Sequence, residues 1–118
     1  MSHLYTYRAN LARVIDGDTF DFEVDLGFHI SNQIRVRLAD IDTDEIHGVK
    51  KESDQYKRGQ RQKRFSKDRL KSADDIILKT YKDGTGKYGR YLAEVLVDGE
   101  DLKSLLIEEF GENVLLEQ

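Results

Sequence analysis

Three short clusters in this chain hold carboxylates and arginines in a pattern that suits phosphodiester chemistry. The first is Asp16-Gly17-Asp18-Thr19, the second runs over residues 37–45, and the third is Lys87-Tyr88-Gly89-Arg90. Carboxylate oxygens are ligands for hard cations, a glutamate can take a proton from water, and guanidinium groups match phosphate oxygens in shape and charge. Together, the three clusters predict metal-assisted attack on a phosphodiester.

The candidate metal ligands are Asp18, Asp42 and Thr43, which come from the ends of different expected strands. Two carboxylates, a threonine carbonyl and several waters fit a Ca²⁺ site that keeps positions open for substrate oxygens. Mg²⁺ also binds through two carboxylates, so the ligand type alone does not choose between the two ions. The three histidines are isolated along the chain, and no set of them has the spacing of a zinc site.

The candidate catalytic residues are Arg37, Glu45 and Arg90. Glu45, three residues after Asp42, is placed to act as general base on a water, and the two arginines can hold the non-bridging phosphate oxygens. Lys87 and Tyr88 lie next to Arg90 in sequence and are candidate phosphate contacts. Each residue alone also has an ordinary interpretation, as a loop acid, a salt-bridging strand residue or part of a hairpin turn.

The hydrophobic pattern predicts an α+β fold that is mainly β: a five-stranded barrel of the oligonucleotide-binding type, with a helix between strands 3 and 4 and a C-terminal helix. The expected strands cover residues 9–15, 19–25, 34–41, 76–82 and 91–97, and the expected helices cover residues 55–73 and 101–110. In the first helix the apolar stripe is thin, consisting of Tyr56, Phe65, Leu70 and Ala73, and Gly59 weakens it.

Strand alternation places several of the candidate residues. Asp18 has the same parity as Phe20 and Phe22, so it heads an inward-facing row and needs a partner for its charge. Arg37 lies on the opposite face of its strand from the apolar side chains. The alternation fails over residues 39–41, which predicts a bulge or the end of the strand.

Composition is that of one folded domain spanning residues 1–118, with 36% charged and 38% hydrophobic residues. No apolar run is long enough for a membrane span, and the N-terminus shows no signal peptide, so a cytoplasmic protein and a secreted one after signal removal both stay open. The net charge of −4 is unevenly distributed. Residues 57–71 hold eight basic side chains against Asp68, which indicates either a solvated helix face or a cationic rim for a polyanion.

These motifs resemble the signature of the staphylococcal nuclease (thermonuclease) family over about residues 9–114. The residues concerned are Asp-Gly-Asp-Thr from Asp16, Arg-Leu-x-x-Ile-Asp-Thr-x-Glu from Arg37, and Lys-Tyr-Gly-Arg-x-Leu-Ala from Lys87. The resemblance implies a five-stranded oligonucleotide-binding-type barrel and Ca²⁺-dependent hydrolysis of DNA and RNA that leaves 3′-phosphates. It implies calcium ligation by Asp18, Asp42 and the Thr43 carbonyl, a general-base role for Glu45, and phosphate binding by Arg37, Arg90, Lys87 and Tyr88.

One departure from the family pattern lies inside the second motif. Many relatives have proline where this chain has Asp44, and the chain contains no proline at all. Proline would stiffen the approach to Glu45, whereas Asp44 is expected to add a negative charge beside the metal.

The sequence therefore predicts a Ca²⁺-dependent nuclease, an endonuclease-type hydrolase that acts as a monomer on DNA, RNA or both and has no membrane partner. The alternative is a non-catalytic module of the same fold that binds nucleic acid or protein. The acidic balance outside residues 57–71 favours that alternative, whereas the complete set of polar site residues favours the enzyme.

Overall fold

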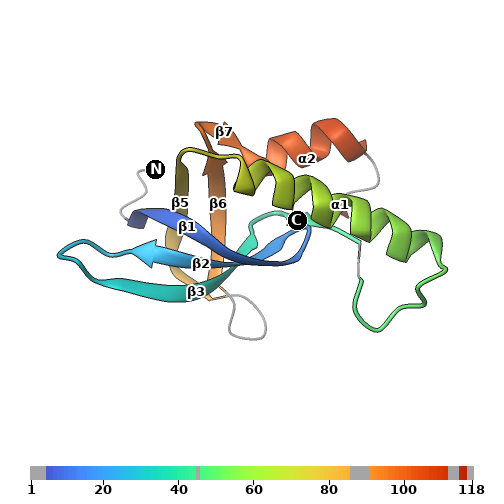
Figure 1. Cartoon of the computed structure of the whole chain (residues 1–118), viewed down its shortest axis with the longest axis horizontal. Coiled ribbons are helices and arrows are strands. Elements are labelled where there is room, and N and C mark those ends of the chain that lie inside the picture. Colours follow the sequence, from blue (N-terminus) through green and yellow to red (C-terminus); the bar gives the residue numbers. More distant parts are fainter. Residues whose placement is uncertain (1–4, 45, 86–90, 112–114, 117–118) are drawn as a thin grey trace.

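The structure is a computed structural model that describes residues 5–44, 46–85, 91–111 and 115–116. It is an α+β fold, mainly β, in which a closed barrel carries two helices along one side (Figure 1). The elements are β1 (Tyr5–Asp16), β2 (Thr19–Asp25), β3 (Ser31–Leu38), β4 (Ile41–Asp42), α1 (Asp54–Lys71), β5 (Ile76–Thr85), β6 (Tyr91–Val97), β7 (Glu100–Asp101), α2 (Leu102–Phe110) and β8 (Leu115–Leu116).

Five long strands form the barrel in the order β3-β2-β1-β5-β6, and all of these neighbours are antiparallel. The barrel closes because β3 also pairs with β6, in parallel, with Val36 opposite Tyr91. The short strand β7 extends β6, and β4 pairs with β8. In chain order, α1 follows β4 and precedes β5, the fourth long strand. The expected barrel of the oligonucleotide-binding type is confirmed.

The barrel interior is filled by the apolar side of each strand. On β2, Phe20 and Phe22 are fully buried, with ring centroids 5.8 Å apart, as the alternation predicted. Leu102 and Leu106 of α2 are also fully buried and belong to the same apolar cluster. The side chain of Asp101 caps α2 by accepting from the backbone N–H of Lys103, and Gly111 ends the helix at a φ of 55°.

The strand expected over residues 34–41 is two strands, β3 and β4, separated by a turn at Ala39 and Asp40. Asp40 has a φ of 65°, in the left-handed region that interrupts a strand and reverses the direction of the chain. The failed alternation over residues 39–41 is thus a strand end. As a consequence, Asp42 and Thr43 turn back toward the start of β2.

Helix α1 begins after Ser53, whose hydroxyl accepts a hydrogen bond from the backbone N–H of Tyr56. Of the expected apolar stripe, Leu70 is buried, and Phe65 and Ala73 are partly buried against the core. The fully buried positions of the helix also include Gly59, Gln62 and Ser66, which the stripe did not contain. Gly59, Gln62 and Ser66 face loops whose backbone groups need hydrogen-bond partners, so small and polar side chains occupy much of the buried face.

Phe65 of α1 is only partly buried, and its ring packs edge-on against Phe110 of α2 with centroids 5.6 Å apart. The guanidinium of Arg69 lies 5.3 Å from the centre of the Phe65 ring. This contact joins the two helices, and both phenylalanines also pack against the core. None of the helices in the described part of the chain has the length and apolar character needed to cross a membrane.

Candidate functional site

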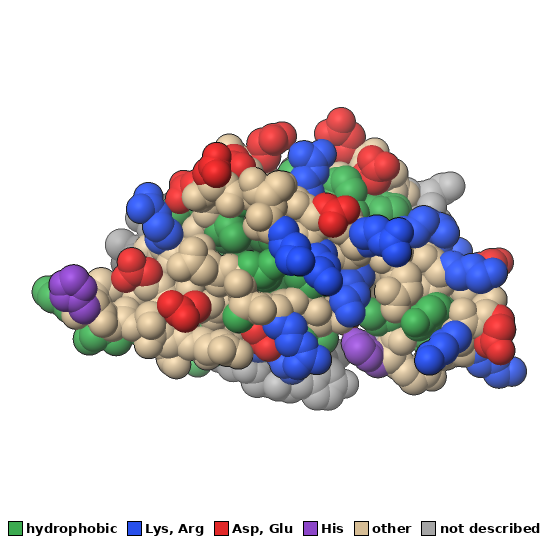
Figure 2. Space-filling view, viewed as in Figure 1, with side chains coloured by type: hydrophobic (Ala, Val, Ile, Leu, Met, Phe, Trp, Pro, Cys, Tyr) green, Lys and Arg blue, Asp and Glu red, His purple; other side chains and the backbone are tan. Residues whose placement is uncertain are grey.

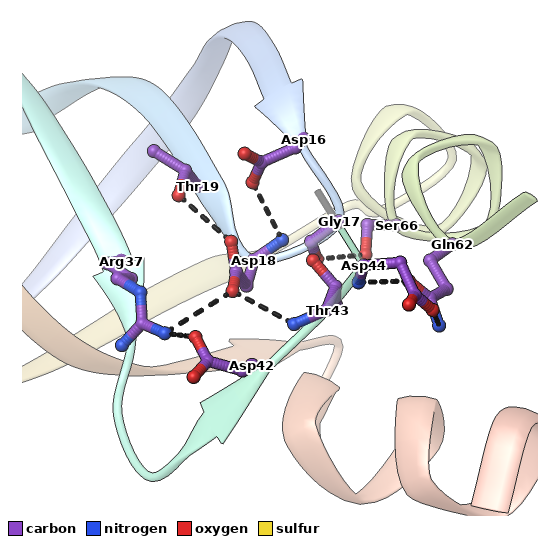
Figure 3. Close-up of polar contacts among 10 residues, drawn as sticks. All are labelled: Asp16, Gly17, Asp18, Thr19, Arg37, Asp42, Thr43, Asp44, Gln62 and Ser66. Carbon is purple, nitrogen blue, oxygen red and sulfur yellow. Dashed lines mark hydrogen bonds and ion pairs between the residues drawn. The ribbon is translucent and has the colours of Figure 1, made fainter. Parts of the chain in front are cut away.

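Two loops that are far apart in sequence meet at one end of the barrel (Figure 3). Asp18 lies just before β2, and Thr43 just after β4. The backbone N–H of Thr43 donates to one carboxylate oxygen of Asp18, with nitrogen and oxygen 3.1 Å apart, and the Thr19 hydroxyl donates to the other at 3.0 Å. Both oxygens of the Asp18 carboxylate are therefore hydrogen-bonded inside the protein.

Arg37 joins the two candidate calcium carboxylates. Its Nη2 atom lies 3.6 Å from Oδ2 of Asp18 and forms an ion pair with Oδ1 of Asp42. Arg37 lies on the outward face of β3, as expected, yet only 8% of its surface is exposed, because polar groups of the site surround it. Asp42 is more open, with 40% of its side chain exposed. One guanidinium thus contacts both carboxylates.

The environment of Asp18 makes its charged form less favourable than it is in water. Burial, together with the hydrogen bond and negative charge of Asp16, raises the pKa of Asp18 to about 7. The Thr43 N–H and the Arg37 guanidinium oppose this rise in pKa.

The oxygen donors at this position fit a hard cation. Asp18, Asp42 and Thr43 offer carboxylate, carbonyl and hydroxyl oxygens, which are the ligands that Ca²⁺ takes. The Thr43 hydroxyl is buried and has no hydrogen-bond partner within the described ranges. In those same ranges, no group of three or more Asp, Glu, His or Cys side chains could hold a metal ion, so the remaining ligands would be backbone, water or substrate oxygens.

Helix α1 is hydrogen-bonded to both loops, the one that contains Gly17 and the one that contains Asp44. The hydroxyl of Ser66 donates to the carbonyl of Gly17 at 2.8 Å, and Gln62, which is fully buried, hydrogen-bonds Asp44. A Cβ atom on Gly17 would lie 2.9 Å from Cγ2 of Thr43, so only glycine permits this approach. Sequence reasoning missed Gln62 and Ser66, whose spacing of four residues on one helix face was the available signal.

The sequence led us to expect the negative charge of Asp44 beside the metal, but its carboxylate is paired with α1. Its carboxylate pairs with both Nε and Nη2 of Arg58, at 3.2 and 3.3 Å, and the contact raises the pKa of the Arg58 guanidinium. The Asp44 side chain is therefore compensated by α1 instead of adding an unpaired negative charge beside the metal position.

Four of the candidate residues lie outside the described residues: Glu45, Lys87, Tyr88 and Arg90. Of the other four, the structure brings Asp18, Arg37, Asp42 and Thr43 together in one site. Tyr91, which follows Arg90 in sequence, pairs with Val36 on β3, so the third motif leads into a strand that neighbours Arg37.

The model of the family of staphylococcal nuclease homologues matches residues 35–111, which is more than half of the chain. The chain therefore belongs to the family of staphylococcal nuclease homologues. A comparison with curated proteins found no match. Residues 35–111 include the second and third motifs, whereas Asp18 lies ahead of the matched segment and joins the site through its contacts with Thr43 and Arg37.

Proposed function

We propose that this protein is a Ca²⁺-dependent nuclease that hydrolyses phosphodiester bonds of DNA, RNA or both and leaves 3′-phosphate ends. The observation that carries the proposal is the position of Arg37, between the carboxylates of Asp18 and Asp42. The site holds two carboxylates, a guanidinium and a threonine hydroxyl that has no partner among the described residues. The carboxylate and hydroxyl oxygens suit a cation, and the guanidinium suits a phosphate. Membership of the family of staphylococcal nuclease homologues supports the same conclusion.

In this proposal Asp18, Asp42 and Thr43 hold the calcium ion. When bound, the ion supplies positive charge that stabilises the negative charge developing on the phosphate oxygens. Arg37 binds a non-bridging phosphate oxygen, and its rigid, charged fork needs no reorganisation during the reaction. The burial of Arg37 strengthens this interaction, because the surrounding medium screens charge less than water does.

The remaining candidate residues act on the water and the phosphate. Glu45 takes a proton from the attacking water, while Arg90 holds a second phosphate oxygen and Lys87 and Tyr88 contact the nucleotide phosphate. The bond between phosphorus and the 5′ oxygen breaks, and that oxygen takes a proton from solvent and leaves as a 5′ hydroxyl. The phosphate therefore stays on the 3′ oxygen of the upstream nucleotide. These roles follow from the family motifs, and each is part of the proposal.

The outer face of α1 is proposed to attract the substrate strand. Figure 2 shows lysine and arginine side chains gathered over this helix. The exposed members of the group are Lys57, Arg61, Arg64, Lys67, Arg69 and Lys71. A row of exposed cations attracts a polyanion over a long range and makes its binding depend on salt. The other side of the same helix hydrogen-bonds the site loops through Ser66 and Gln62.

The proposal is tested by measuring the acid-soluble nucleotides released from single-stranded DNA and from RNA, with Ca²⁺ and with a calcium chelator. We expect release only with Ca²⁺, and a loss of about 10²–10⁴-fold in turnover for Glu45→Gln. Glu23→Gln, which changes an exposed acid on β2, is the matched control and should keep full activity. A folded, calcium-saturated protein that is inactive on both substrates would favour the non-catalytic binding module.

A further inference from the structure

Asp44, in the loop that follows β4, is hydrogen-bonded to α1 through both its backbone and its side chain. The backbone N–H of Asp44 donates to Oε1 of Gln62 at 2.7 Å, and Nε2 of Gln62 donates to Oδ2 of Asp44 at 3.0 Å. Arg58 contacts the same carboxylate with two nitrogens. One amide and one guanidinium of α1 therefore hold a single loop residue through four hydrogen bonds, as Figure 3 shows for Gln62.

The hydrogen bond to the Asp44 N–H also determines where the preceding carbonyl points. The N–H of Asp44 and the carbonyl of Thr43 belong to one planar trans peptide, so they point in opposite directions. Because the N–H points at Gln62 of α1, the Thr43 carbonyl points away from the helix. The other peptide of Thr43 is held as well, since its N–H donates to Asp18. Both peptide planes that flank Thr43 are thus fixed by hydrogen bonds.

The backbone of the loop lies directly against α1 at this position. A Cβ atom on Gly59 would lie 2.8 Å from the carbonyl oxygen of Asp44 and 2.4 Å from Cγ2 of Ile46. Ile46 is itself buried. Asp44 and Ile46, the residues on either side of Glu45 in sequence, are therefore both held against the helix.

We propose that Gln62 and Arg58 are positioning residues that orient the Thr43 carbonyl toward the cation and hold Asp44 against α1. This inference rests on the proposed function for the identity of the cation and the reaction. Gln62 orients the peptide, and Arg58 neutralises Asp44 so that its carboxylate stays on the helix side of the loop. If these partners were removed, Asp44 would leave the helix and its charge would approach Asp42.

The first experiment compares Gln62→Ala and Arg58→Ala with Gln60→Ala. Gln60 is the matched control because its amide donates to Tyr56 of the same helix. Calcium affinity is measured by titration calorimetry, and kcat and KM are measured on single-stranded DNA with saturating calcium. We expect a calcium Kd weakened about tenfold or more and a lower kcat for the two test variants, and no change for the control. The KM should change little, because neither side chain is proposed to contact substrate.

A paired exchange provides a rescue. Gln62→Glu keeps an acceptor for the Asp44 N–H but places a carboxylate against Oδ2 of Asp44, so we expect it to weaken calcium binding at least as much as Gln62→Ala does. When Asp44→Asn is added, the amide at position 44 can donate to the carboxylate at position 62, which reverses the direction of the original hydrogen bond. We expect calcium affinity and kcat to recover in this double variant. A double variant that is no better than Gln62→Glu alone would contradict the proposed geometry.

Hydrogen exchange at the Asp44 amide separates this inference from the proposed function. We expect Gln62→Ala to speed the exchange of that amide and Gln60→Ala to leave it unchanged, whether or not the protein cleaves nucleic acid. Unchanged exchange, or calcium affinity and kcat at wild-type values in folded Arg58→Ala, would overturn the positioning role. A wild-type protein that binds no calcium and cleaves nothing would overturn the proposed function, while the exchange result would still decide whether Gln62 holds the peptide.

Discussion

The backbone N–H of Thr43 donates a hydrogen bond to the carboxylate of Asp18, 25 residues earlier in the chain, with the two atoms 3.1 Å apart. This bond joins the first and second acidic motifs, which lie on different strand ends. It also uses one oxygen of a carboxylate that belongs to a residue only 6% exposed. The site is therefore assembled by the barrel from loops that are distant in sequence.

The pH dependence of stability should report the burial of Asp18. The folded-state pKa of Asp18 is about 7 against an ordinary value of 3.8, so the folded protein binds more protons than the unfolded chain between these values. The contribution of Asp18 to the free energy of unfolding should therefore decrease as pH rises from about 4 to 7, by on the order of 4 kcal/mol at most. Denaturant unfolding in a calcium chelator measures it, and Asp18→Asn should remove this part of the pH dependence.

Calcium binding should compete with protonation of the same carboxylate. Because Asp18 must lose its proton to bind a cation, calcium affinity should decrease as pH falls below about 7, and binding near that pH should release protons. Calorimetry in buffers with different ionisation enthalpies measures the released protons. Calcium affinity that stays constant between pH 5 and pH 8 would mean that Asp18 is not a ligand.

Replacing Arg37 should separate cation binding from catalysis. In Arg37→Ala, the two carboxylates lose a positive charge, so calcium should bind at least as tightly as in the wild type, while kcat should fall by about 10²–10³-fold. Arg35→Ala is the matched control, because Arg35 is on the same strand and pairs with Asp21 at 2.8 Å outside the site. If both variants lose the same activity, Arg37 has no special role in the reaction.

Gly59→Ala should destabilise the protein even though alanine favours helix more than glycine by about 1 kcal/mol. The new methyl group would lie 2.4 Å from Cγ2 of Ile46 and would push the loop away from α1. We expect a decrease of about 1–3 kcal/mol in the free energy of unfolding. Thermal unfolding measures it, with Lys57→Ala on the exposed side of the helix as the control; an increase in stability would mean that the loop can move aside freely.

The basic face of α1 should control substrate affinity more than turnover. Lys67→Gln with Lys71→Gln should weaken binding of single-stranded DNA and reduce the salt dependence of log K by about 0.7 for each phosphate that is no longer neutralised. Lys79→Gln with Lys103→Gln removes the same charge from β5 and α2 and is the control. Fluorescence anisotropy at several salt concentrations measures both pairs, and equal decreases in affinity would indicate only a general charge effect.

Local patterns in the sequence were sufficient to predict the barrel. The alternation that placed Phe20 and Phe22 inside is confirmed, because a strand buried on one face must repeat every two residues. The failed alternation before Asp42 also marked a real strand end. The helix α1 was harder to predict, since its partner is the polar backbone of two loops and its buried face therefore carries Gln62 and Ser66.

By itself, the sequence determined which chemistry the site can offer, because residue types and their order need no partner to be recognised. Asp18, Arg37, Asp42 and Thr43 could all be named in this way. Only the tertiary structure decided that one guanidinium contacts both carboxylates and that Asp44 pairs with α1. Such contacts depend on where each strand ends and on how closely α1 approaches the loops. Both are determined by the close packing of segments that are distant in sequence.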